Sequence, residues 1–190
     1  MGLDSVELLV AFEKRFNLSI PDTEAEWIDT VAEAAECIGR HLRVPVAASR
    51  SAVFTAVLAS LLQCLSQQKL PAASITAATQ LEALWPAGPA AEGLQLLAGC
   101  LALKIPGLPK PRTGFSAWLL GQPSAPVWAG KTVADFVDWL VALNQEQLLP
   151  TVATLYDVQR VVVGITSEKI GVPVDEIRLT DSFVNDLGID

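Results

Sequence analysis

The sequence contains few basic residues and a single histidine. Lys and Arg number 13 against 21 Asp and Glu, which gives a net charge of −8 over 190 residues. This balance argues against nucleic acid as a partner and favours a basic surface on another protein. The sequence also lacks a Cys-His or Ser-His-acid arrangement with supporting motifs, a glycine-rich phosphate loop and a metal-ligand spacing. We therefore expect neither an enzyme nor a metal site.

Long hydrophobic runs are also absent. The longest apolar run, AVFTAVLASLLQCL at 52–65, is interrupted by polar residues. It is shorter than the roughly 20 helical residues that span a bilayer, so it predicts a buried helix and no membrane span. The start of the chain has no basic segment followed by an apolar run. We therefore expect no signal peptide and a cytoplasmic protein.

Cysteine is scarce as well. Cys37, Cys64 and Cys100 are odd in number and widely spaced, and each lies inside an apolar helical pattern. This pattern favours three buried thiols over a disulfide framework or a zinc site.

The negative charge is concentrated at the two ends of the chain. Residues 1–43 carry a net charge of −5 and residues 151–190 carry −4, which leaves +1 for residues 44–150. The two ends therefore share a character that the middle lacks, as parts of one structure would. The hydrophobic content of 51% is ample for buried cores.

The chain contains an internal repeat. Apolar residues precede Pro21 and Pro106 at the same five offsets, namely Leu9, Phe12, Phe16, Leu18 and Ile20 in the first copy and Leu94, Leu97, Leu101, Leu103 and Ile105 in the second. Downstream, TVAEAAECI at 30–38 matches TVADFVDWL at 132–140. Each begins with a threonine that can cap a helix, and the acid three residues later can close a capping box.

A second pair of segments also matches. GVPVDEIRLTDSFVNDLG at 171–188 and KLPAASITAATQLEALWP at 69–86 place isoleucine four residues after proline, with Phe183 or Leu81 six residues later. An apolar helical pattern precedes each. The middle of the chain is then a complete unit, and the two ends are the halves of a second copy in reversed order. Chance similarity between short helical patterns is the alternative interpretation.

The repeat predicts an all-α protein with two small helical bundles, one of them assembled from the N- and C-terminal halves. We expect one half at 1–43 and the other at 152–190, with a complete unit at 50–145 and linkers at 44–50 and 141–151. The core of the assembled bundle is predicted to contain Leu9, Phe12, Phe16 and Ile38 against Val158, Val162, Ile165, Ile177 and Phe183. The middle unit has a longer stretch before Thr132, in which GFSAWLL could form a short helix. There we expect Trp118 and Trp128 to pack over the bundle or to bind a partner.

Read with the last part before the first, the ends give LYDVQRVVVGITSEKIGVPVDEIRLTDSFVNDLGID followed by GLDSVELLVAFEKRFNLSIPDTEAEWIDTVAEAAECI. This order closely resembles the acyl carrier protein family over essentially its whole length. In that family the carrier serine follows Asp-Leu-Gly-x-Asp, and the second helix runs into Ile-Pro-Asp before a Thr-Val helix. The middle unit resembles a degenerate carrier.

The resemblance implies a function in fatty-acid or polyketide-type synthesis. A carrier of this family holds acyl groups on a 4'-phosphopantetheine arm attached to its serine. The alternative is an unmodified carrier-like module that only docks partner enzymes. Two explanations of the order stay open, a circular permutant or a segment of a longer carrier array, and both predict that the two ends pack together.

The attachment serine is missing at the position that the resemblance implies. Asp190 stands where the family has the residue just before its serine. We therefore expect that the family's order is interrupted at the serine, with the two sides of this break at the two ends of the chain. The serine position corresponds to Gly2, nineteen residues before Pro21, and to Ala87 in the middle unit. Ser5 imitates the local motif and is the candidate cofactor-binding residue, but it lies about one helical turn too close to the proline. An exposed serine in the first turn of a helix is therefore the favoured interpretation of Ser5.

The resemblance also implies partners. Acids at the docking face of such carriers meet basic patches on acyl-transfer and synthase enzymes, and a phosphopantetheinyl transferase is a further possible partner. The candidate partner-binding residues are Asp4, Glu7, Glu13, Asp186 and Asp190. A merely solvated helix face is the alternative. Lys14 and Arg15 fall where many carriers are acidic, which predicts weaker or differently directed docking.

Overall fold

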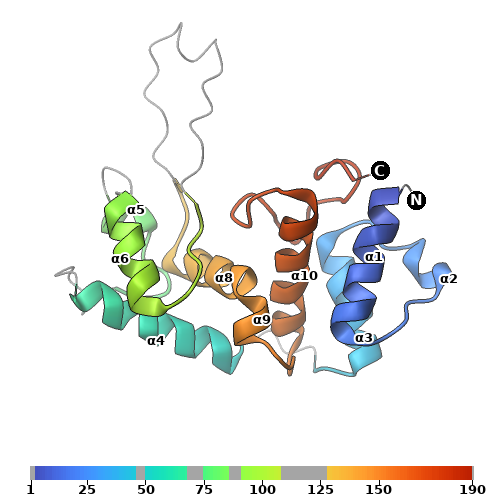
Figure 1. Ribbon diagram of the computed structural model, residues 1–190, viewed down its shortest axis with the longest axis horizontal. Helices are drawn as coiled ribbons and strands as arrows, with labels where there is room; N and C mark the ends of the chain where they lie inside the picture. The colour runs from blue at the N-terminus through green and yellow to red at the C-terminus, as the bar shows by residue number, and fades with distance from the viewer. Residues whose placement is uncertain (1–2, 46–49, 68–74, 86–90, 108–127, 190) are drawn as a thin grey trace, which may run out of the picture.

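The structure is a computed structural model that describes residues 3–45, 50–67, 75–85, 91–107 and 128–189 (Figure 1). These residues form helices and no strand, which confirms the predicted all-α fold class. The helices are α1 (Leu3–Phe16), α2 (Asp22–Ala25), α3 (Val31–Leu42), α4 (Ala52–Gln67), α5 (Leu81–Leu84), α6 (Ala91–Leu101), α8 (Val133–Leu143), α9 (Gln145–Leu148) and α10 (Leu155–Ile170). Each helix in this described part is too short or too polar to cross a bilayer.

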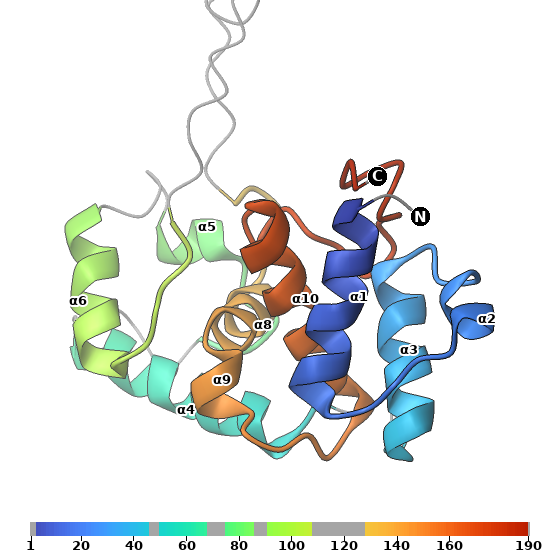
Figure 2. The same ribbon diagram turned by 45° about the vertical axis from the view of Figure 1, so that its right-hand side comes forward.

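Helix α10, which belongs to the C-terminal segment, lies between the N-terminal segment and the middle of the chain. It packs against α1 and α3 on one side and against α8 and α9 on the other (Figures 1 and 2). Helix α8 packs in turn against α4, and α4 packs against α6. The first and last parts of the sequence are therefore neighbours in space, as the repeat predicts.

Backbone hydrogen bonds join the segment after α10 to the start of α3. The N–H groups of Val31, Ala32 and Phe183 donate to the carbonyl oxygens of Asp181, Leu179 and Asp29 at 3.2, 2.8 and 2.8 Å. The same three bonds recur in the middle of the chain, where Val133, Ala134 and Leu81 donate to Thr79, Ala77 and Lys131, each at 2.8 Å. The two sets follow the register in which the sequence repeat aligns.

The helices of the repeat also correspond in length and in how they end. Helices α4 and α10 each contain 16 residues. Helices α1 and α6 end at Phe16 and Leu101, which are counterparts in the repeat. The next residue is left-handed in both copies, with φ of 51° at Asn17 and 53° at Ala102. Asparagine adopts this conformation more readily than alanine, so only the first copy has a residue suited to the turn.

The predicted helix caps are present. Thr30 caps α3 and Thr132 caps α8, each in a capping box with the acid three residues later. A third capping box, formed by Thr154 and Asp157, starts α10. Of these three capped helix starts, those of α3 and α8 were predicted from the sequence. The start of α10 follows the same Thr-x-x-acid pattern.

The predicted core of the end segments is buried. Val158, Val162 and Ile38 are fully buried, and Phe183 is 7% exposed. Phe12, Phe16, Ile165 and Ile177 are also buried, whereas Leu9 is partly buried and packs against the same core. The apolar faces of both ends therefore contribute to one core.

Two cysteines depart from the sequence interpretation. Cys64 on α4 and Cys100 on α6 form a disulfide with a Cα–Cα distance of 6.0 Å, whereas Cys37 is a buried thiol as expected. The prediction of three thiols was wrong because helical periodicity places a cysteine on a face of its own helix and does not reveal which helix lies opposite.

Two further expectations concern the linker at 141–151 and the long stretch before Thr132. The expected linker at 141–151 contains the end of α8 and all of α9, and Asn144 and Leu149 within it are buried. Trp128 is buried against Trp85, Phe136 and Trp139, in agreement with the packing interpretation. Trp118 and the GFSAWLL segment lie outside the described residues.

Candidate functional site

The start of α1 lies beside the end of the described chain. Asp4 and Glu7 on α1 share a hollow of about 260 Å³ with Lys169 at the end of α10 and with Ile189. Ile170, Leu187 and Gly188 complete its lining. The residues before Asp190 resemble the segment that precedes a carrier serine. They therefore lie beside the first turn of α1, which resembles the helix that follows such a serine. Gly2, Ala87 and Asp190 lie outside the described residues.

The segment at 182–189 is held in place by hydrogen bonds within itself and to Asp29. The Ser182 hydroxyl donates to Asp29 Oδ1 at 2.9 Å, and its backbone N–H donates to Asp186 Oδ2 at 2.8 Å. The Ile189 N–H closes the turn by donating to the Phe183 carbonyl at 2.8 Å, and Ile189 is 2% exposed. Two side chains of this segment, Phe183 and Ile189, are thus anchored in the core.

The candidate residues on α1 fall into two groups. Asp4 and Glu7 are exposed at the hollow, and Ser5 between them is half-buried. Glu13 lies further along, where its Oε1 accepts the backbone N–H of Ile20 at 2.7 Å. Its carboxylate therefore holds the chain after α1. Asp186, the candidate residue in the segment at 182–189, also binds its own chain, because its carboxylate accepts the backbone N–H of Ser182.

Arg15 has a structural role that the sequence did not reveal. Its Nε donates to Gln145 Oε1 at 3.0 Å, and its guanidinium also donates to the Leu149 carbonyl. Arg15 therefore ties α1 to α9 and the loop that follows. The partners are more than 100 positions away in sequence, so no local pattern could have identified them.

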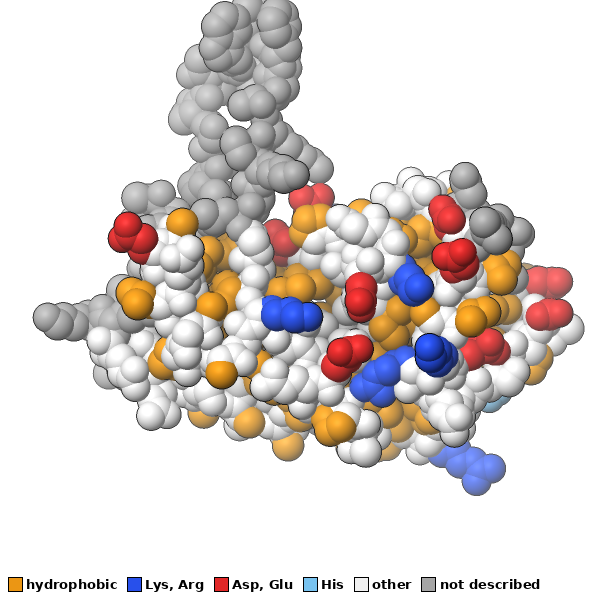
Figure 3. All heavy atoms as spheres, viewed as in Figure 1, with side chains coloured by type: hydrophobic (Ala, Val, Ile, Leu, Met, Phe, Trp, Pro, Cys, Tyr) orange, Lys and Arg blue, Asp and Glu red, His pale blue; other side chains and the backbone are white. Residues whose placement is uncertain are grey.

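A larger hollow runs between α1, α9 and α10. It has a volume of about 1030 Å³, and its lining includes Val6, Val10, Lys14 and Glu168. Val6 and Val10 are 42% and 52% exposed. Figure 3 shows acidic and basic side chains interspersed on this face, over the region of α1 and α10. The face therefore offers mixed charge around exposed apolar side chains rather than a continuous acidic stripe.

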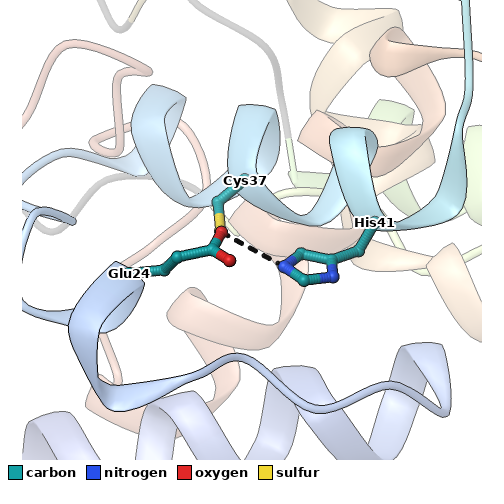
Figure 4. A group of neighbouring side chains, drawn as sticks. All are labelled: Glu24, Cys37 and His41. Atoms are coloured by element: carbon teal, nitrogen blue, oxygen red, sulfur yellow. Dashed lines mark hydrogen bonds and ion pairs between the residues drawn. The ribbon is translucent and has the colours of Figure 1, made fainter.

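The residues at the start of α1 do not provide a phosphopantetheine attachment point at the position that the resemblance implies. A helix start favours an anion such as the arm's phosphodiester, because backbone N–H groups point toward it. Gly2 nevertheless has no hydroxyl to be esterified. Ser5 has one, but it is half-buried within the helix. Possible metal ligands gather at a different place in the described residues, where Glu24, Cys37 and His41 meet (Figure 4).

Part of the chain is similar to acyl carrier proteins. It is 51% identical over 42 residues to the acyl carrier proteins of two strains of Porphyromonas gingivalis, ATCC 33277 and W83. The match covers 22% of this chain and 54% of each relative, so the chain spans about half the length of the curated relatives it matches. No protein-family model matches the chain, and no solved structure does.

Proposed function

We propose that this chain contains an acyl-carrier-like module of fatty-acid or polyketide-type synthesis, in which the start of α1 is the place for a phosphopantetheine arm. The thiol of such an arm would hold the acyl group as a thioester, and tethering would present it to enzymes at high effective concentration. Within the proposal, residues 1–43 and 152–190 form this module together. Residues 50–145 form a degenerate carrier-like unit.

The observation that carries the proposal is the pairing of the two end segments. The backbone bonds of Val31, Ala32 and Phe183 join the start of α3 to the segment after α10. Such bonds fix the register of two segments, since shifting either one would leave buried backbone groups unpaired. The segment that ends in Asp-Leu-Gly-Ile-Asp is thereby directed to the start of α1.

The sequence match supports the same arrangement. A relative that is matched over 54% of its length is what a divided carrier predicts, because each half of a divided carrier should align with about half of an undivided one. A circular permutant and a segment of a longer carrier array would both give this order.

The proposed partners are acyl-transfer and synthase enzymes with basic docking patches. Asp4 and Glu7 are exposed beside the helix start, where charge attraction would speed encounter. Glu13 and Asp186 bind groups of their own chain, so we propose a smaller contribution from them.

A second function is favoured by Gly2. A carrier-like unit without the serine hydroxyl cannot form the phosphodiester at that position, and it would then act as an unmodified interaction module. Such a module would dock partner enzymes without carrying an acyl group. The presence or absence of the serine is therefore what separates the two functions experimentally.

The test is a rearranged chain in which residues 51–190 are followed by residues 2–45 and Gly2→Ser is introduced. This order puts Asp190 directly before the new serine. After treatment with a phosphopantetheinyl transferase and coenzyme A, we expect an increase in intact mass of one phosphopantetheine unit. The matched control is the same rearranged chain with glycine at position 2, which should show no increase. A folded serine variant that stays unmodified would contradict the proposed carrier site.

A further inference from the structure

We propose that Glu24, Cys37 and His41 form a binding site for a divalent transition metal of the Zn²⁺ type. Cys37 and His41 lie one helical turn apart on the same face of α3, and Glu24 reaches them from α2 (Figure 4). Three different metal-binding side chains therefore converge from two helices. The site is independent of the carrier function proposed above.

Two of the three distances between the ligand atoms are close to those of a tetrahedral site. Glu24 Oε2 lies 3.4 Å from Cys37 Sγ and 3.2 Å from His41 Nε2, and all three atoms lie within 4.8 Å of one another. With ordinary zinc bond lengths, neighbouring ligand atoms in a tetrahedral site are about 3.3–3.6 Å apart. A metal ion could therefore replace the hydrogen bonds with little movement of the side chains.

The nature of the ligands selects the class of metal. A thiolate and an imidazole favour Zn²⁺ and Co²⁺ over Mg²⁺ and Ca²⁺, which prefer oxygen ligands. On binding, the Cys37 thiol would release its proton to solvent, and the resulting thiolate would coordinate the metal.

The cluster is accessible from solvent on one side. The His41 and Glu24 side chains are 29% and 39% exposed, whereas Cys37 is 2% exposed beneath them. Three protein ligands leave one tetrahedral position open for water or another ligand. A bound ion would also connect the four-residue helix α2 to α3, and we therefore expect it to raise the melting temperature.

Arg40 provides an internal test of this interpretation. Its Nη2 lies 3.8 Å from Glu24 Oε2, so its positive charge competes with a metal for the same carboxylate. Arg40 is exposed, and its removal should leave the fold intact. If the cluster is a metal site, Arg40→Gln should tighten binding. If the cluster only ties α2 to α3 by hydrogen bonds, the variant should have no such effect.

The experiment is titration of the full chain with Co²⁺, followed by displacement with Zn²⁺. It is done without reductant, so that the Cys64–Cys100 disulfide stays closed and Cys37 is the only thiol. We expect the absorption of a tetrahedral thiolate-bound Co²⁺, its loss on adding Zn²⁺, and a melting temperature that Zn²⁺ raises. Cys37→Ser should abolish the thiolate absorption. His41→Ala should weaken Zn²⁺ binding by about tenfold or more.

Glu26→Gln is the matched control, because Glu26 is an exposed acid next to α2 and outside the cluster. The affinity of the Glu26→Gln variant for Zn²⁺ should equal that of the unaltered chain. His41 is an exposed residue, so its variant keeps the test decisive if Cys37→Ser fails to fold. The proposal is wrong if the unaltered chain shows no thiolate-to-cobalt absorption, or if His41→Ala binds Zn²⁺ as tightly as the Glu26 variant.

Discussion

The Ser182 hydroxyl donates to Asp29 Oδ1 across 2.9 Å, although the two residues are 153 positions apart in the chain. The bond lies beside a single antiparallel β-bridge between the backbones of Thr30 and Ser182. The equivalent β-bridge in the middle of the chain joins Gln80 to Thr132. The backbone pairing is therefore kept in both copies of the repeat, whereas the side chains around it differ. Backbone geometry, rather than a particular side-chain contact, is what the repeat preserves.

Truncating Phe183 should weaken the packing between the two ends. Phe183 is buried in the shared core, so Phe183→Ala should lower the free energy of unfolding by about 3 kcal/mol through lost burial and the cavity that remains. Urea unfolding followed by circular dichroism measures this change.

The neighbouring Val184 is the control for this prediction. It is 58% exposed, and Val184→Ala should change the free energy of unfolding by less than about 0.5 kcal/mol. A loss for Phe183→Ala below about half the expected value would mean that the end segments do not bury this ring together.

Gly164 controls how closely α10 approaches α8. A Cβ atom at this position would lie 2.3 Å from the carbonyl oxygen of Ala142, which is backbone and cannot rotate away. Gly164→Ala should therefore push the helices apart and lower the free energy of unfolding by roughly 1–3 kcal/mol.

Gly99→Ala is the matched control for Gly164→Ala. Gly99 lies within α6, and beyond its own helix backbone a Cβ there would meet no atom of the described structure within 4 Å. The same substitution should stabilise the protein by roughly 0.5–1 kcal/mol, because alanine favours the helix. Opposite signs in the two unfolding free energies are the expected result. Equal signs would contradict the close approach of α10 to α8.

The sequence predicted features that depend on local pattern and on the repeat. Thr30 and Thr132 were identified as caps because the acid three residues later is visible in the sequence. The burial of Phe183 followed from its match to Leu81, and both residues are buried. The end pairing was predictable because neither end segment alone supplies a complete bundle.

Other features could not be predicted because they depend on which surfaces meet. The role of Arg15 requires the position of Gln145, which the tertiary packing of α1 and α9 determines. The spacing of Cys37 and His41 puts them on one helix face, but the third ligand, Glu24, comes from a separate short helix. Two metal-binding residue types one turn apart are too weak a pattern to indicate a metal site, and the third residue of the proposed site is brought to them only by the fold.

The capping box of α3 should make stability fall at acid pH. Glu33 Oε2 accepts the backbone N–H groups of Thr30 and Asp29, each at 2.9 Å, and these bonds hold the pKa of Glu33 below its ordinary value of 4.5. A lowered pKa in the folded state means that this stabilisation is complete above the unfolded-state pKa. It is lost as pH falls through the lower folded-state value.

The measurement is the free energy of unfolding between about pH 5 and about pH 3. Glu33→Gln keeps an acceptor for the capping box but does not titrate, so its stability should fall less steeply than that of the unaltered chain. Glu36→Gln is the control, since Glu36 is an exposed acid on the same helix outside the box. A pH dependence that is identical for the Glu33 and Glu36 variants would contradict the proposed contribution.

Ser5 should not accept a phosphopantetheine group efficiently in the chain as written. Its local sequence imitates the motif of a carrier serine, but it lies within α1 about one helical turn beyond the position that corresponds to Gly2. It is also half-buried, so a transferase would have to reach a hydroxyl away from the helix start. After treatment with transferase and coenzyme A, we expect little or no increase in intact mass, and Ser5→Ala should give the same result. Efficient modification that Ser5→Ala abolishes would show that the local motif determines the site and that the register derived from Pro21 does not.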